Sequence, residues 1–290
     1  MRSVTMHERI SLEERSPSKS TDLPLATSLT SVEICRPAEI ANRICLWSCA
    51  KIALPLNRLL PLGVLGGVYI GLGGALATLA TSDSNLGAGP TRWLGGIAFS
   101  LGLVLVVIGG AELSTGNCLM AMARMRGLAT SRHLWRNWSW SYTANAAGAW
   151  LLAWVIVGAG TYDAEPLHSA AIRIAEAKLA LTPAQAFLRG VLANMLVCLA
   201  VWLAMSSQSA IGKVVGIVFP ISAFVALGFE HSIANFYLIP AGLMVGAKGT
   251  LGEVVCNIVP VTGGNLVGGV VVAAGLLWCS HGRSGQNMGS

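Results

Sequence analysis

Two eight-residue stretches of this chain repeat one pattern of small, acidic and amide residues. Residues 110–117 read GAELSTGN and residues 228–235 read GFEHSIAN, so both follow G-x-E-x-S-x-x-N at an offset of 118. A second match, NAAG at residues 145–148 and NLVG at residues 265–268, keeps an offset of 120. Two matches in the same order at nearly one spacing predict an internal duplication.

The composition predicts an integral membrane protein. Of the 290 residues, 54% are hydrophobic and 11% are charged, whereas a soluble domain has about 25% charged residues. The mean hydropathy of +0.65 points the same way. The net charge of +6 fits basic membrane loops, so no nucleic-acid partner is expected. The seven scattered cysteines lack metal-ligand spacing and should pack as small apolar side chains, so we expect no metal and no cofactor.

Six apolar runs are candidates for bilayer spans. They are, in chain order, residues 59–80, 93–123, 137–159, 184–205, 214–245 and 258–279. The second and fifth exceed one span of about 17–25 residues. Each of them contains one octet, so each is predicted to break there into two half-helices. Because three spans per half is an odd number, the predicted fold class is all-α integral membrane, with six transmembrane helices in an inverted 3+3 repeat and helices 2 and 5 broken.

The termini are predicted to lie in the cytoplasm. Basic residues gather in the loop after the second run, with Arg124, Arg126, Arg132 and Arg136, and the cytoplasmic side of a membrane protein favours such charges. Residues 1–48 are predicted to be a largely disordered and amphipathic tail that lacks a secretory signal, with a surface helix over residues 32–54. Residues 49–280 are the expected six-helix channel domain, and residues 281–290 a short tail.

His231 is the only histidine inside a predicted span, and an ionisable side chain at membrane depth is a functional hypothesis by default. A structural alternative is a histidine that bonds a carbonyl freed by the helix break. Thr115 lies in the matching break of the first half, where its hydroxyl could donate to an anion or to His231. It could equally cap its own half-helix.

The acidic and amide residues of the octets are predicted to be structural. Glu112 and Glu230 would repel an anion from the pore, so we expect them to accept hydrogen bonds from backbone N–H groups at the breaks. Asn117 and Asn235 are expected to do similar work. Polar ties between helices are also expected from three further amides: Asn145, Asn194 and Asn265.

The two breaks together predict a site for a small anion or its neutral acid. Half-helix N-termini present unpaired N–H groups and the positive end of a dipole. Four apolar residues lie within two turns of the breaks and could form constrictions on either side of the site, or be ordinary packing residues: Phe99, Leu103, Leu113 and Phe224.

The octets, together with ANMLVCLAVW at residues 193–202 and IVPVTGGN at residues 258–265, resemble the formate/nitrite transporter family. The likeness covers roughly residues 51–278. It implies an aquaporin-like fold, a homopentamer in the lipid bilayer of the inner (plasma) membrane, and one pore per subunit. It also implies no enzyme activity, and passage of formate, nitrite or hydrosulfide with a proton.

The resemblance also implies roles for individual residues. His231 becomes the central pore histidine and Thr115 its partner, while Phe99, Leu103, Leu113 and Phe224 become constriction residues. Lys178 matches a lysine that draws anions into the outer vestibule, Asn194 a pore asparagine, and Lys51 an inner-vestibule lysine. Ser114 stands where formate channels usually have phenylalanine, which predicts a looser inner constriction.

Two other classes of function remain open on the sequence. A membrane redox subunit with bis-histidine haem would need two histidines within spans, and only His231 is found there. An aquaporin-type channel for neutral solutes would normally carry paired N-P-A motifs, but here the breaks read NCL and NFY. Hydrosulfide, or small weak acids in general, are the alternative cargo to formate and nitrite.

Overall fold

The computed structural model describes residues 34–282, and this part of the chain is helical with no strand. Residues 1–33 and 283–290 lie outside the described part. The structure therefore includes residues 34–48 of the predicted N-terminal tail and residues 281–282 of the predicted C-terminal tail. The helices are α2 (Pro37–Ile52), α3 (Leu56–Ser82), α4 (Ala88–Gly109), η1 (Gly116–Met120), α5 (Ala121–Met125), α6 (Ser131–Gly158), α7 (Leu167–Leu179), α8 (Pro183–Ser206), α9 (Ala210–Ala226), α10 (Ser232–Met244) and α11 (Leu251–Val267), followed by the π-helical segments η2 (Gly268–Gly275) and η3 (Trp278–Gly282).

Several of these helices have the length and composition of membrane spans. By those criteria α3, α4, α8 and the continuous helix from α11 to η3 could each cross a bilayer, and α9 and α10 are shorter apolar helices. The 28-residue α6 is long but more polar. The polar segment at residues 160–183, for which no helix was predicted, contains the amphipathic α7.

Each octet begins where one helix ends and runs into the start of the next, η1 or α10, and the leading glycine ends the first helix. Gly110 ends α4 with φ +81°, and Gly228 follows α9 with φ +72°, a region that glycine enters without steric cost. After each glycine the next N–H turns back to the helix just ended. Ala111 donates to the carbonyl of Val106 at 3.0 Å, and Phe229 to that of Phe224 at 3.0 Å. This C-terminal capping pattern stops the helix and lets the octet leave the helix axis.

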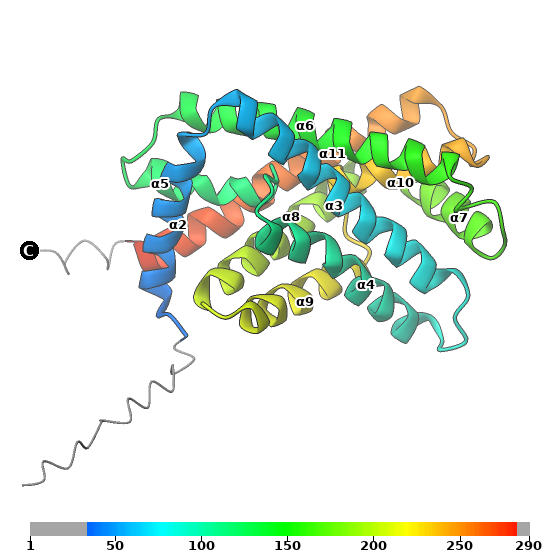
Figure 1. Cartoon of the computed structure of the whole chain (residues 1–290), viewed down its shortest axis with the longest axis horizontal. Coiled ribbons are helices and arrows are strands. Elements are labelled where there is room, and N and C mark those ends of the chain that lie inside the picture. The colour runs from blue at the N-terminus through cyan, green and yellow to red at the C-terminus, as the bar shows by residue number, and fades with distance from the viewer. Residues whose placement is uncertain (1–33, 283–290) are drawn as a thin grey trace, which may run out of the picture. The chain divides into compact units, whose positions relative to one another are not determined.

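Two helix pairs, α3 with α6 and α8 with α11, pack through glycine in corresponding ways. Figure 1 shows α3 running alongside α6. A Cβ on Gly67 of α3 would collide with the backbone of Asn145 on α6, and one on Gly264 of α11 would collide with the backbone of Phe187 on α8. The close approach brings Asn145 and Asn265 within reach of the two octets.

Candidate functional site

Thr115 and His231, one from each octet, are in direct contact through their side chains. The Oγ1 atom of Thr115 lies 2.9 Å from Nε2 of His231, and both side chains are buried. The other ring nitrogen, Nδ1, accepts a hydrogen bond from the Ala234 N–H at 3.2 Å, at the start of α10. A neutral imidazole with an unprotonated Nδ1 carries its hydrogen on Nε2. We therefore assign Nε2–H as the donor to Thr115, which leaves the threonine hydroxyl hydrogen free to donate elsewhere.

Apolar side chains lie on the His231 side of this contact. A small chamber is lined by Phe99, Leu103, Leu113, Phe224 and His231, so the structure brings all four predicted constriction residues together. The rings of Phe99 and Phe224 meet edge to face with centroids 5.4 Å apart. Three further lining residues, which look in the sequence like ordinary aliphatic residues of long apolar helices, were not predicted: Ile70, Val197 and Ile221.

A wider cavity, here called the Lys51 cavity, lies on one side of the chamber. It has a volume of about 290 Å³ and shares Leu103 and Leu113 with the chamber. The Nζ atom of Lys51 donates to Oε1 of Glu112 at 2.5 Å and lies 4.3 Å from the centre of the Trp47 ring. Its ammonium is thus neutralised and held against an aromatic face.

A second wide cavity, the Lys178 cavity, reaches His231, Phe99 and Phe224 from another side and has a volume of about 360 Å³. Lys178 donates to both carboxylate oxygens of Glu230 at 3.0 Å each. The chamber shares Leu103 and Leu113 with one wide cavity, and Phe99, Phe224 and His231 with the other.

The two octet glutamates accept hydrogen bonds from side chains, so the prediction of backbone N–H donors is wrong. Besides its lysine, Glu112 accepts from Asn117 Nδ2 at 2.8 Å, and Glu230 accepts from Asn235 Nδ2 at 2.7 Å. The physical reason is that a buried carboxylate is best stabilised by a paired cation. The lysines come from α2 and α7, far away in the sequence.

Two amides that the sequence analysis missed complete this network. Asn117 also donates to Asn137 Oδ1 at 2.8 Å, and Asn235 to Asn257 Oδ1 at 2.8 Å. Residues 137 and 257 are separated by the same 120 positions as the NAAG and NLVG motifs, so extending the repeat would have found the pair.

The breaks are anchored by Asn145 and Asn265. Asn145 Oδ1 accepts from Ser114 N, and Asn265 Oδ1 accepts from Ser232 N, each at 2.9 Å. Asn194 is fully buried and donates to the Thr115 carbonyl at 3.3 Å. Like Thr115, it lines neither wide cavity nor the chamber, and its hydrogen bond supports the backbone of Thr115.

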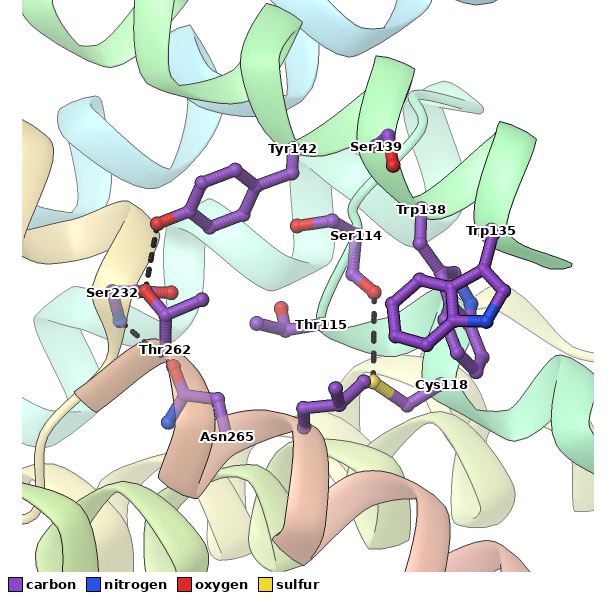
Figure 2. Close-up of a pocket in the computed structure, with 11 residues that line it drawn as sticks. Ser114, Thr115, Cys118, Trp135, Trp138, Ser139, Tyr142, Ser232, Thr262 and Asn265 are labelled. Atoms are coloured by element: carbon purple, nitrogen blue, oxygen red, sulfur yellow. Dashed lines mark hydrogen bonds between the residues drawn. The ribbon is translucent and has the colours of Figure 1, made fainter. Parts of the chain in front are cut away.

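Figure 2 shows a third cavity, of about 200 Å³, beside the same breaks. Ser114 and Ser232 point their hydroxyls into it, and Tyr142 and Thr262 hydrogen-bond at 2.7 Å along its wall (Figure 2). The residues described as lining it carry no charge. Ser114 faces this cavity, whereas Leu113 faces the chamber, so Ser114 does not loosen the constriction as predicted. Leu113 and Ser114 point to opposite sides of the break, and Thr115 lines the same cavity as Ser114.

The described residues contain no cluster of three or more histidine, cysteine or acidic side chains that could hold a metal ion. A helical and largely apolar chain in which two cavities meet at a buried polar contact has the architecture of a membrane transport protein.

Comparison with known proteins agrees. The family model of the formate/nitrite transporters matches residues 38–279, and the chain belongs to this family. It is 39% identical to a probable formate transporter of Methanothermobacter thermautotrophicus over 264 residues, covering 84% of this chain and 96% of the relative. It is 33% identical to the formate channel FocA of Escherichia coli K12 over 253 residues, covering 78% and 87%.

Solved structures give the same result. The chain superposes on an FNT family ion channel with a TM-score of 0.77 at 26% identity, covering 83% of this chain and 98% of the other. A pentameric formate channel with formate bound matches with a TM-score of 0.69 at 32% identity, covering 78% and 97%. These are channels and transporters, so the protein is not an enzyme.

Proposed function

We propose that this protein carries a small monovalent anion, formate or nitrite, across the membrane together with a proton. The observation that carries the proposal is the buried contact between Thr115 and His231 at an apolar chamber that borders two wider cavities. Relatives named as formate transporters and channels support formate as one cargo.

The proposed path crosses an inverted 3+3 repeat of six spans. Its spans are α3, then α4 with η1 and α5, then α6, α8, α9 with α10, and α11 with its π-helical extension. The matched roles of Asn117 with Asn235 and of Asn145 with Asn265 support the duplication. We propose the division expected from the sequence, with an N-terminal tail (1–48), a channel domain (49–280) and a C-terminal tail (281–290), although α2 runs across the first boundary.

The Lys51 cavity is the inner vestibule and the Lys178 cavity the outer one. The basic segment where α5 connects to α6 favours this orientation, with both termini in the cytoplasm: Arg126 lies in the loop and Arg132 in the first turn of α6. We further propose a homopentamer in the inner (plasma) membrane. A solved relative described as pentameric supports that assembly.

The chamber favours a neutral permeant. Moving a bare anion past Phe99 and Phe224 would cost several kcal/mol, on the order of the penalty for a buried ion. A neutral imidazole has one N–H, which is already donated to Thr115, so His231 has no acidic proton to give. The anion therefore takes a proton from hydronium in the solution of the vestibule and crosses as the uncharged acid. Thr115 lines the third cavity and not the chamber, so it acts on the permeant through its contact with His231.

Uptake into proteoliposomes under an imposed pH gradient tests the proposal. Formate, nitrite and hydrosulfide are compared in one preparation, with empty liposomes as the baseline. We expect saturable uptake that rises with an inward proton gradient. His231→Ala should lower formate flux about tenfold, because loss of a buried hydrogen-bond partner is worth about 1.5 kcal/mol. Unchanged flux and pH dependence in His231→Ala would refute the role of the histidine.

Hydrosulfide, or small weak acids in general, remain the alternative cargo, since the neutral and apolar chamber does not discriminate among small uncharged acids. Equal flux of all three compounds with weak pH dependence would favour that general channel over a formate or nitrite transporter.

A further inference from the structure

The Lys178 cavity has an excess of positive charge among its lining side chains. Three cationic residues line it, Arg92, Lys178 and Arg189, and Glu230 is the one acidic residue among the described lining residues. With all four ionised, the lining carries a net charge of +2. The Lys51 cavity differs, because the charged residues among its described lining are Lys51 and Glu112, whose charges cancel.

Lys178 does not supply that excess. Its ammonium is shared between both oxygens of Glu230, and the side chains are only 14% and 5% exposed. Such a pair presents a dipole to an approaching anion, and the opposite charge lies 3.0 Å away from the ammonium. Glu230 in turn is held by Asn235, which keeps the carboxylate in place. The remaining charge therefore resides on the two arginines.

Arg92 and Arg189 reach the cavity from two different helices, and neither pairs with a carboxylate of the described residues. Arg92 lies in the first turns of α4 and Arg189 in the first turns of α8. The ion pairs within residues 34–282 are those of Lys51 and Lys178, and neither involves an arginine. One guanidinium nitrogen of Arg189 donates to the Gly228 carbonyl, just beyond the end of α9, at 3.4 Å. This bond ties Arg189 to the break that leads to His231.

We infer that Arg92 and Arg189 form an anion-capture site in the outer vestibule, which concentrates small carboxylates and other monovalent anions above His231. The planar guanidinium suits carboxylate oxygens, since it offers several N–H donors in a fixed fork. The inference rests on the proposed function. In this inference the arginines attract anions, and Lys178 neutralises Glu230.

The test measures formate influx at low, subsaturating concentration into cells that express the full chain. The variants are Arg92→Gln, Arg189→Gln and both together, and Arg173→Gln is the control, because Arg173 is exposed on α7 but does not line the cavity. A unit charge about 10 Å away in water changes the local anion concentration about twofold. We expect the double variant to lose about fourfold in influx at low ionic strength, with an unchanged maximal rate.

Screening provides a second readout. At an ionic strength of about 0.5 M the Debye length shrinks to a few ångströms, so the difference between the double variant and the wild type should fall below about 1.5-fold. A loss of influx caused by misfolding of the variant would persist at high ionic strength. The charge-preserving variant with Arg92→Lys and Arg189→Lys should retain at least half of the influx.

A paired variant separates the two assignments of the attracting charge. Lys178→Met combined with Glu230→Gln keeps the lining at +2 and should remain sensitive to ionic strength. If influx in the arginine variants equals that of Arg173→Gln while the paired variant loses its salt dependence, the arginines are not the capture site. Absence of influx in the wild type would instead refute the proposed function.

Discussion

Replacing Asn265 with alanine should release the second break from the helices that hold it. The Asn265 side chain makes three hydrogen bonds to main-chain groups. Its Oδ1 accepts from Ser232 N at 2.9 Å, and its Nδ2 donates to the carbonyls of Gly190 at 2.8 Å and Glu230 at 2.9 Å. The residue is 2% exposed, and the residues that it bonds, Ser232, Gly190 and Glu230, are buried as well.

The magnitude follows from three orphaned backbone groups. Each buried group left without a partner costs about 1–3 kcal/mol in soluble proteins, and polar ties inside membranes measure nearer to about 0.6–1.7 kcal/mol. At the membrane values, three groups lower the free energy of unfolding by about 2–5 kcal/mol. For a domain of this size that corresponds to a fall of about 5–15 °C in the unfolding temperature.

Asn265→Asp should be no better than alanine. An aspartate keeps an acceptor for Ser232 N but turns carboxylate oxygens towards the Gly190 and Glu230 carbonyls. Formate flux should fall in both variants, since Ser232 follows His231 directly in the chain.

The assay is tryptophan-fluorescence thermal unfolding of the purified protein in detergent, with Thr143→Ala as the control. Thr143 is exposed on α6 and donates only to the Ser139 carbonyl of its own helix. A difference of about 1 °C in melting temperature corresponds to about 0.3 kcal/mol in the free energy of unfolding. If Asn265→Ala and Thr143→Ala differ by less than that, the asparagine does not anchor the break.

Two further predictions concern packing and charge. Gly67→Ala should lower the yield of folded protein and its melting temperature, because the new Cβ would collide with the backbone of α6. Gly89→Ala is the control and should be neutral, because a Cβ at that position meets open space. Equal melting temperatures of the two variants would contradict the close packing. Lys51→Met should destabilise by about 3–5 kcal/mol, because it leaves the buried Glu112 carboxylate unpaired. Adding Glu112→Gln should restore most of that loss, and chemical unfolding that shows no such rescue would count against the ion pair.

Much of the architecture was accessible from the sequence. The octet glycines marked where α4 and α9 end, because a left-handed backbone conformation favours glycine at the end of a helix. The 118-residue offset paired Thr115 with the segment of His231, and the apolar run lengths indicated membrane helices, four of which meet the length and hydropathy expected of a span. Local periodicity and internal repetition can be read directly from the amino-acid sequence.

The tertiary structure decided which charges are neutralised and which face the cavities. Sequence alone could not pair Lys51 with Glu112 or Lys178 with Glu230, since the partners are 61 and 52 positions apart and lie on elements that meet only after folding. It also could not tell that Ser114 and Leu113 face different cavities. Which cavity a side chain faces depends on how the backbone of each break is oriented. That orientation is set by contacts with helices distant in the chain, including the hydrogen bonds from Ser114 N to Asn145 and from Ser232 N to Asn265.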